Sequence, residues 1–257
     1  MLSSNQVKHI NSLKQKKFRE IYRQFLAEGS KLVKEILESQ YKVLNVYAIA
    51  DWLKQNEDIL LSNQVSFVEV SLGEMERITA LSSPSPALAV AEIPEMTGPP
   101  ALINDLVLVL DDIRDPGNLG TIIRIADWFG IKTIICSENT VDLYNPKVMQ
   151  ATMGSAFRIN IFYTDLKKFL SSLSPEVKIY GTFAQGDSIY STPLEKQGII
   201  IIGNESSGIS NEISLKVTDR ISIPAYIKDS RHTDHAESLN ASIATAIICS
   251  EFRRRMG

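Results

Sequence analysis

A chain of 257 residues with 44% hydrophobic and 22% charged residues is long enough for one large globular domain or two modest ones. No apolar run approaches the ~18 residues of a membrane span, and no hydrophobic stretch follows the polar, basic N-terminus, so neither membrane insertion nor secretion is expected. Two cysteines outside any C-x-x-C pair exclude a cysteine-built zinc ribbon, and a net charge of −3 confines any nucleic-acid contact to a local patch.

The first 95 residues predict a small α/β domain that begins with a basic segment. In residues 9–23 only Glu20 opposes the charges of Lys14, Lys16, Lys17, Arg19 and Arg23. Such a run is either a solvated face at a chain end or an arm that binds RNA. After it, the apolar patterns predict a helix at 30–39, strands at 43–50, 65–70 and 87–92, and a short helix after Ser71.

A linker is expected where the chain becomes rich in proline and glycine. Residues 92–100 read EIPEMTGPP, and these residue types interrupt both helices and strands. We therefore divide the chain into a first domain at 1–95, a linker at 96–103 and a second domain at 104–257.

Beyond the linker, continuous Ile, Val and Leu runs alternate with helical patterns. This order predicts a parallel sheet covered on both faces, with a ligand site at the carboxyl ends of its strands. The expected strands are 106–110, 133–136, 177–181, 199–202 and 220–223, and the expected helices are 118–129, 146–153, 165–173, 210–216 and 238–253.

Several common site motifs are missing. The sequence contains no G-x-G-x-x-G and no G-x-x-x-x-G-K-[ST], which argues against a dinucleotide-binding turn and a P-loop. Glu205 stands where a nucleophile elbow would need serine, so a serine hydrolase is discounted. His232, Asp234, His235 and Glu237 are competent metal ligands, but their spacing matches no common zinc signature. A solvated loop is favoured there, and no metal is expected.

The first cluster of polar residues follows the strand at 106–110. Asn118 suits the N-cap of the next helix, and Arg124 lies one turn beyond Gly120, which has no side chain to cover the backbone. A guanidinium beside free amides at a helix start can bind an anion. The alternative is a surface arginine paired with Asp127 or Asp112.

Two further clusters follow later strands. Gly203 and Gly208 bracket a tight turn with Glu205 inside it, and a turn alone does not require that carboxylate. After Ile223 and Pro224 comes a helix of small and apolar residues. Its first turn contains Asn240, a poor interior helix former, which we expect to have a polar partner or ligand.

In chain order these clusters resemble a known set of three motifs. N-x-G-x-x-x-R at 118–124, G-N-E-x-x-G at 203–208, and Ile-Pro at 223–224 with E-S-L-N at 237–240 look like the motifs of the SpoU (TrmH-type) RNA ribose 2′-O-methyltransferases of the SPOUT superfamily. The resemblance covers about residues 104–254. The N-terminal region is similar to the family's ribosomal-protein-like, RNA-binding α/β domain.

The resemblance implies a parallel-sheet α/β domain whose C-terminal segment forms a deep trefoil knot. It also implies S-adenosylmethionine (AdoMet) as cofactor and a homodimer formed through the knotted domain. A cytoplasmic location is expected separately, from the lack of secretion and membrane signals and from the cysteine usage. Usually only a few residues separate Ile-Pro from E-S-L-N in this family, whereas here Ala225 to Ala236 intervene. This longer loop bears on the cofactor contacts just after Pro224.

Residue roles are carried over by motif position. The catalytic neighbourhood would comprise Asn118, Arg124, Glu205, Ser238 and Asn240. The cofactor would contact Thr182, Gly203, Asn204, Gly208, Ile223, Pro224 and Leu239. Because the guanidinium of an arginine rarely loses its proton, we assign Arg124 to phosphate binding and alkoxide stabilisation, and Glu205 to base catalysis or to orienting Arg124.

The expected function is methyl transfer from AdoMet to a ribose 2′-hydroxyl. Ribosomal RNA is favoured because an added N-terminal domain of this type is more typical of the ribosomal enzymes. The alternatives are a transfer RNA 2′-O-methyltransferase and a non-catalytic RNA-binding or assembly factor on the same fold. A nicotinamide-dependent oxidoreductase is less favoured, because the sequence lacks the fingerprint loop.

Overall fold

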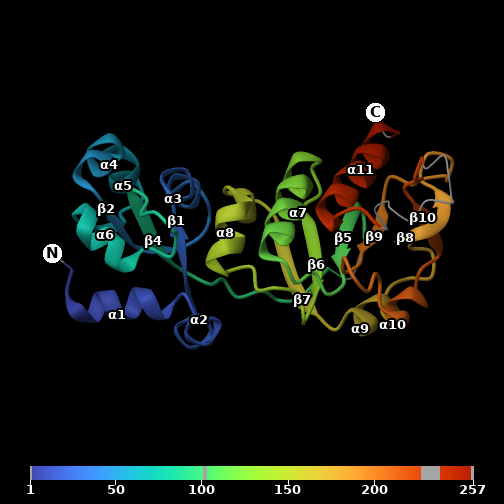
Figure 1. The fold of residues 1–257 in the computed structure, drawn as a ribbon, viewed down its shortest axis with the longest axis horizontal. Helices are drawn as coiled ribbons and strands as arrows, with labels where there is room; N and C mark the ends of the chain where they lie inside the picture. The colour runs from blue at the N-terminus through green and yellow to red at the C-terminus, as the bar shows by residue number, and fades with distance from the viewer. Residues whose placement is uncertain (1, 101–102, 227–237, 256–257) are drawn as a thin grey trace. The chain divides into compact units, whose positions relative to one another are not determined.

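The computed structural model describes residues 2–100, 103–226 and 238–255, which form two compact units (Figure 1). Unit 1 comprises Met1–Met96 and Asp142–Arg158, and unit 2 comprises Thr97–Val141 and Ile159–Gly257. The first division lies within the proline-rich stretch. Residues 142–158, however, belong to unit 1, whereas the sequence pattern had assigned them to the second domain.

Unit 1 is built on a four-stranded sheet in the order β1-β4-β2-β3. Strand β4 runs antiparallel to both β1 and β2, and β2 runs parallel to β3. The strands are β1 (Gln24–Glu28), β2 (Val43–Ala48), β3 (Ser66–Glu69) and β4 (Ala87–Glu92). The helices are α1 (Ser4–Ser12), α2 (Lys16–Tyr22), α3 (Ser30–Leu37), α4 (Ala50–Gln55), α5 (Glu57–Ser62), α6 (Leu72–Ile78) and α8 (Pro146–Thr152), with a 3-10 turn η1 (Ser155–Phe157).

The segment 142–158 completes unit 1 through aromatic packing. Helix α8 contacts β1. The ring of Tyr144 lies 4.5 Å from that of Phe25 on β1, and the ring of Phe157 lies 5.2 Å from that of Tyr41. The local pattern predicted the helix at 146–153 but carries no information about which sheet receives it.

Unit 2 contains a six-stranded sheet in the order β10-β8-β9-β5-β6-β7, and every neighbouring pair is parallel. This confirms the predicted parallel sheet. The strands are β5 (Leu106–Leu110), β6 (Thr133–Ser137), β7 (Asn160–Thr164), β8 (Ile179–Ser188), β9 (Gly198–Ile202) and β10 (Asp219–Ser222). The helices are α7 (Pro116–Trp128), α9 (Leu166–Ser171), α10 (Asn211–Ser214) and α11 (Ala241–Arg254).

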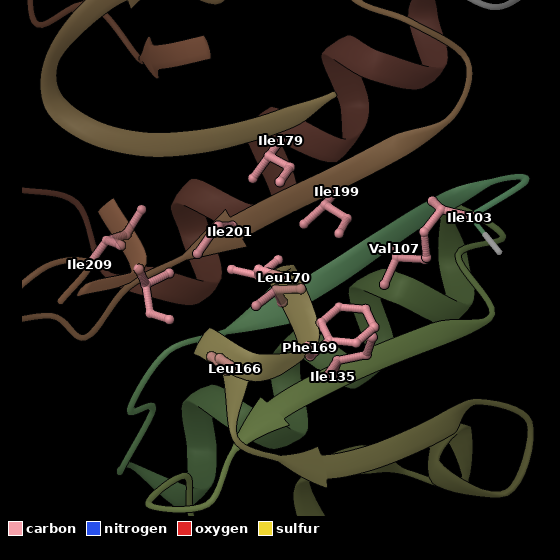
Figure 2. Packing of buried hydrophobic residues seen from close by; sticks show 12 residues of the cluster. Ile103, Val107, Ile135, Leu166, Phe169, Leu170, Ile179, Ile199, Ile201 and Ile209 are labelled. Atoms are coloured by element: carbon pink, nitrogen blue, oxygen red, sulfur yellow. The ribbon is translucent and has the colours of Figure 1, made fainter. Parts of the chain in front are cut away.

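Strands β5 and β9 form the centre of unit 2, and all of their residues are buried. Because side chains alternate along a strand, Val107 and Val109 of β5 face the same way and pack with Leu170 of α9 in one apolar cluster (Figure 2). Within unit 2, α7 and α11 lie on the opposite side of the sheet from α9 and α10 (Figure 1). Because β5 and β9 are neighbouring parallel strands, the loops that follow them emerge together at one edge of the sheet.

None of the helices in the described parts of the chain combines the length and hydropathy of a membrane span.

Candidate active site

The loops after β5 and β9 are joined by hydrogen bonds. Asp111, buried at the end of β5, accepts a 2.8 Å hydrogen bond at Oδ2 from the backbone N–H of Ser210. The backbone carbonyl of Asp112 accepts a 2.8 Å bond from Nδ2 of Asn204, and Asp112 itself has a left-handed φ of 60°. These two contacts hold the first and second motif segments against each other.

Asp115, not Asn118, caps helix α7, so the predicted N-cap was wrong. The Asp115 side chain accepts a 2.8 Å hydrogen bond from the backbone N–H of Asn118, and Pro116 occupies the first helical position, where its missing N–H costs nothing. Asn118 is therefore inside the first turn. Its side-chain amide is free of capping and can serve another purpose.

A chain of hydrogen bonds through Asn118 joins the three motif segments. Its Nδ2 donates to Oε1 of Glu205, 87 residues away, and its Oδ1 accepts a 2.9 Å bond from Nδ2 of Asn240, 122 residues away. Asn240 in turn caps α11, because its Oδ1 accepts from the backbone N–H of Ser242 at 2.9 Å. Asn240 thus has the polar partner that its position predicted. The direction of donation runs from Asn240 to the carboxylate of Glu205.

Arg124 lies on the exposed face of α7 and makes no hydrogen bond or ion pair with any other described residue. Asp112, one of the partners considered for it, instead accepts a 2.9 Å bond from Nε of Arg114. No hydrogen bond joins Arg124 to Glu205 within the described ranges either. The Arg124 guanidinium therefore presents all its donors to solvent or to a ligand.

The loop 203–208 is a tight turn that needs both of its glycines. A Cβ on Gly203 would lie 2.3 Å from the carbonyl carbon of Gly208, and Gly208 has a φ of +68°. The side-chain oxygen of Asn204 accepts from the backbone N–H groups of Ser206 at 2.9 Å and Ser207 at 3.2 Å. Because Nδ2 of Asn204 binds the carbonyl of Asp112, the Asn204 side chain holds this loop in shape.

The remaining predicted cofactor residues lie on β8, after β10 and before α11. Thr182, on β8, donates from Oγ1 to the carbonyl of Ile201 at 2.9 Å. Ile223 and Pro224 follow β10 and are partly buried, while Leu239 precedes α11 and is exposed. The backbone N–H groups of Ile223 and Leu239 donate to no other described residue.

Some expectations fall partly or wholly outside the described residues. The long loop Ala225 to Ala236 is described only at Ala225 and Tyr226, and the histidine-containing stretch 232–237 lies entirely in the gap. In the ranges that the structure does describe, no three His, Cys, Asp or Glu side chains form a group that could hold a metal ion. Ser238 is exposed and has no hydrogen-bond partner among these residues.

The basic residues of unit 1 have different surroundings. Lys16, Lys17 and Arg23 are exposed. Lys14 is partly buried and donates from Nζ to the carbonyl of Thr79 at 2.5 Å. Burial lowers the pKa of Lys14, and the charge of Glu28 offsets part of this shift.

Arg19 is a correction to the predicted RNA-binding set. Its side chain is only 3% exposed, and its Nη2 lies 2.5 Å from Oδ2 of Asp142. Its Nη1 donates to the carbonyl of Leu13 at 2.9 Å. A buried and fully engaged guanidinium cannot meet a phosphate, so Arg19 stabilises unit 1 instead.

The carboxylates of Asp111 and Asp115 organise the site, and neither role was predicted from the sequence. Asp111 fixes the loop after β9, and Asp115 caps α7. The signal for Asp115 was present, since Asp followed by Pro is a frequent helix start. No local signal identifies the role of Asp111, because its partner Ser210 is 99 residues away.

A cavity of about 790 Å³ lies in unit 1, at the ends of β2 and β3, between Ile49 and Arg77 in the chain. None of the motif residues lines this cavity, so its size alone assigns it no chemistry.

The chain belongs to the SpoU rRNA methylase family, whose model matches residues 105–250. An MRM3-like substrate binding domain matches residues 4–89. Both matches confirm the resemblance inferred from the motifs.

Individual relatives extend this family membership over the whole chain. RlmP of Bacillus subtilis (strain 168), a 23S rRNA (guanosine(2553)-2′-O)-methyltransferase, is 31% identical over 252 residues, covering 97% of this chain and 96% of RlmP. A TrmH-family protein from Porphyromonas gingivalis superposes with a TM-score of 0.87 at 36% identity, covering 99% of both chains. The AdoMet-bound rRNA methyltransferase from Sinorhizobium meliloti gives 0.85 at 29% identity, covering 100% of this chain and 97% of its own.

Proposed function

We propose that this protein transfers a methyl group from AdoMet to a ribose 2′-hydroxyl in ribosomal RNA. The observation that carries the proposal is the hydrogen-bond chain from Asn240 through Asn118 to Glu205, which gathers the three family motifs at one edge of the sheet. Family membership and the rRNA methyltransferase relatives support the same reaction and the same cofactor.

The residues around the loop 203–208 fit AdoMet. Glycine at both ends of the loop leaves its backbone uncovered, so a ligand can approach closely. The unused backbone N–H groups of Ile223 and Leu239 can donate to the edge of a purine, and the exposed Leu239 side chain can cover its face. Gly203, Gly208, Ile223, Pro224 and Leu239 would hold the cofactor, with Thr182 beside its base.

When bound, AdoMet supplies an electrophilic methyl group on a sulfonium sulfur. The ribose oxygen attacks that carbon as the carbon–sulfur bond breaks, and the hydroxyl proton must leave. The protein must therefore align the oxygen and stabilise its developing negative charge. The neutral amides of Asn118 and Asn240 fix the position of Glu205 for this purpose.

We assign Arg124 to the phosphate and to the developing alkoxide, and Glu205 to the proton. Arg124 has every donor available and keeps its positive charge. Glu205 can accept a proton at the oxygen that Asn118 leaves free. The absence of a bond between Arg124 and Glu205 among the described residues favours this division over the alternative in which Glu205 orients Arg124. Ser238 would contact the substrate from the third motif.

Unit 1 would bind RNA through its exposed cations, chiefly Lys16, Lys17 and Arg23. Contacts between such cations and phosphates are local, so they are compatible with the net charge of −3.

A homodimer through unit 2 would use the exposed apolar side chains of α7 and α11. Trp128 on α7 is 85% exposed and Ile243 on α11 is 52% exposed, and the two helices pack against each other. Beside them, a cavity of about 320 Å³ is lined by Tyr190, Ala246, Ile247, Ser250 and Glu251. Arg124 shares the exposed face of α7 with Trp128, so a second copy packed there would enclose it. Sedimentation of the wild type and of Ile243→Glu tests this.

Two further parts of the proposal concern the chain path and the location. Chain order supports the trefoil knot: β10 is at the edge of the sheet, yet α11 returns to pack on α7 near its centre. A crystal structure in which α11 can be withdrawn without passing through a loop would contradict it.

A cytoplasmic location is proposed from the ribosomal RNA substrate, and cell fractionation tests it.

The deciding experiment maps 2′-O-methylation across total RNA from cells with and without this gene. We expect one ribosomal RNA position to lose its methyl group and to regain it when purified protein and AdoMet are added. Loss at a transfer RNA position instead would support the transfer RNA alternative. No change in any RNA, together with AdoMet binding in calorimetry, would overturn the reaction.

A further inference from the structure

Three aromatic rings of α1 and α2 form an ordered cluster on unit 1, which we call the α2 aromatic patch: His9, Phe18 and Tyr22. The ring of Tyr22 lies 4.9 Å from that of His9, edge to face. It lies 6.2 Å from that of Phe18, with only 14° between the ring planes. These neighbours hold the Tyr22 ring in one orientation.

Tyr22 is not a core residue. Its side chain is 44% exposed, and its hydroxyl makes no hydrogen bond to another described residue. Ile21 beside it is 59% exposed. An oriented aromatic ring that is nearly half exposed is suited to stack against another flat group.

Exposed cations flank the patch. On helix α2, Phe18 and Tyr22 form one row of side chains at i and i+4, and Lys17 and Ile21 form the adjacent row. Arg23 follows Tyr22 with a left-handed φ of 53°. Its Nη2 donates to the carbonyls of Pro94 at 3.2 Å and Ile93 at 3.4 Å, and its side chain is exposed. Lys17 has no partner among the described residues, so its charge is available to a polyanion.

We propose that Tyr22 stacks on an unpaired base of the RNA substrate while Lys17 and Arg23 contact the phosphates on either side of that base. The proposal deepens the RNA-binding role given above to unit 1 and rests on it. Rings interleaved with cations are what single-stranded RNA requires, because every base has a face to stack and a phosphate beside it. A base paired in a duplex has no free face, so the patch would select looped RNA over paired RNA.

The test compares two labelled RNAs with the full-length protein by fluorescence anisotropy, without AdoMet. One RNA is a hairpin with an adenosine-rich loop, and the other is a blunt duplex with the same stem. We expect Tyr22→Ala to weaken binding to the hairpin by between about 5-fold and 150-fold and to leave binding to the duplex unchanged. Tyr22→Phe, which keeps the ring, should retain the affinity of the wild type.

Salt dependence separates stacking from charge. Lys17→Gln should weaken the binding of both RNAs and reduce the slope of log affinity against log salt concentration by about 0.7 to 0.9. Tyr22→Ala should leave this slope unchanged. The matched controls are Phe67→Ala, an exposed ring on β3 of the same unit, and Lys54→Gln, an exposed cation on α4. Circular dichroism of each variant establishes that it is folded.

A Tyr22→Ala protein that is folded and binds the hairpin as the wild type does would overturn the proposal. So would an equal loss on hairpin and duplex, or an equal loss with Phe67→Ala. Because these measurements report binding alone, failure of the methylation assay would refute the proposed reaction without affecting them. If neither Lys17→Gln nor Tyr22→Ala changes the binding of either RNA, the α2 aromatic patch is not an RNA-binding surface.

Discussion

The basic segment of unit 1 and the motif site of unit 2 assemble their side chains in opposite ways. Between Lys14 and Arg23, neighbours in sequence end in different surroundings: Arg19 is buried in an ion pair, while Lys17 is exposed. In the site, Asn118, Glu205 and Asn240 are far apart in sequence and share one hydrogen-bond chain. A run of like charges therefore does not define one surface, and separation along the chain does not prevent residues from forming one site.

The largest expected effect tests the buried member of the basic segment. Asp142→Ala leaves the Arg19 charge buried without its partner, and we expect the free energy of unfolding to fall by about 3–5 kcal/mol. Urea denaturation followed by circular dichroism measures this. The control is Glu20→Ala, which removes the exposed ion pair between Lys16 and Glu20 and should cost less than about 1 kcal/mol. Equal effects of the two variants would contradict a structural role for Arg19.

The second prediction tests the exposed arginine of the site. Arg124→Ala should lower kcat for methyl transfer by at least about 100-fold, because the developing alkoxide loses its cation. AdoMet affinity measured by calorimetry should change by less than about twofold, since Arg124 is not assigned to the cofactor. Lys132→Ala, an exposed cation in the same unit, is the matched control. Undiminished methylation by the Arg124 variant would rule out its assigned role.

The third prediction breaks the hydrogen-bond chain at its centre. Asn118→Ala removes the contacts to both Glu205 and Asn240, and we expect kcat to fall by about 10- to 100-fold as the carboxylate loses its fixed position. The KM for RNA should change little. Asn211→Ala, an exposed asparagine on α10, serves as the control in the same kinetic assay. Wild-type turnover in the Asn118 variant would mean that the convergence of the motifs is purely structural.

The smallest expected effect concerns another run of cations, the arginines at 253–255. Arg253 donates to the carbonyl of Phe129 at 2.7 Å, so this residue is also tied to the protein. Hydrogen bonds from Arg254, and then from Arg255, lower the pKa of Glu251 to about 2 despite its burial. All three arginines thus have partners within unit 2.

The sign of the pH dependence follows from this lowered pKa. Glutamate in an unfolded chain has a pKa of ~4.3, so the stabilisation by Glu251 is complete above that pH and is lost as the pH falls toward 2. We expect Glu251→Gln to reduce the free energy of unfolding by about 1–3 kcal/mol at pH 7, with the difference from wild type shrinking below pH ~4.3. Denaturation across this pH range measures it, and a difference that does not vary with pH would contradict the assignment.

Sequence patterns predicted those elements whose signals are local. The apolar run of β9, Ile199–Ile202, and the motif residues around Glu205 were visible without a structure. Edge strand β7 was missed because its sequence, NIFYT, is only partly buried and lacks a continuous apolar pattern. The N-cap of α7 was misplaced because Asp115 and Asn118 have similar capping preference.

The sequence could not predict which residues far apart along the chain form ion pairs, hydrogen bonds or packing contacts. Arg19 resembles its exposed neighbours in every local respect, and its burial depends on Asp142, 123 residues away. The same limit applies to residues 142–158, whose helical pattern says nothing about the sheet on which the helix packs. Hydrogen-bond partners such as Asn118 and Asn240 likewise become visible only in three dimensions.

The inclusion of residues 142–158 in unit 1 affects how the protein can be made and cut. The polypeptide passes between the units three times, so unit 1 cannot be completed during synthesis until residue 158 has left the ribosome. By then β5 and β6 of unit 2 have already emerged. A truncated protein that begins at residue 96 would retain Val148 and Met149 of α8, whose side chains are buried. It would lack β1, the strand that α8 contacts. Exchanging either unit for that of another enzyme therefore requires three junctions, one at each passage between the units.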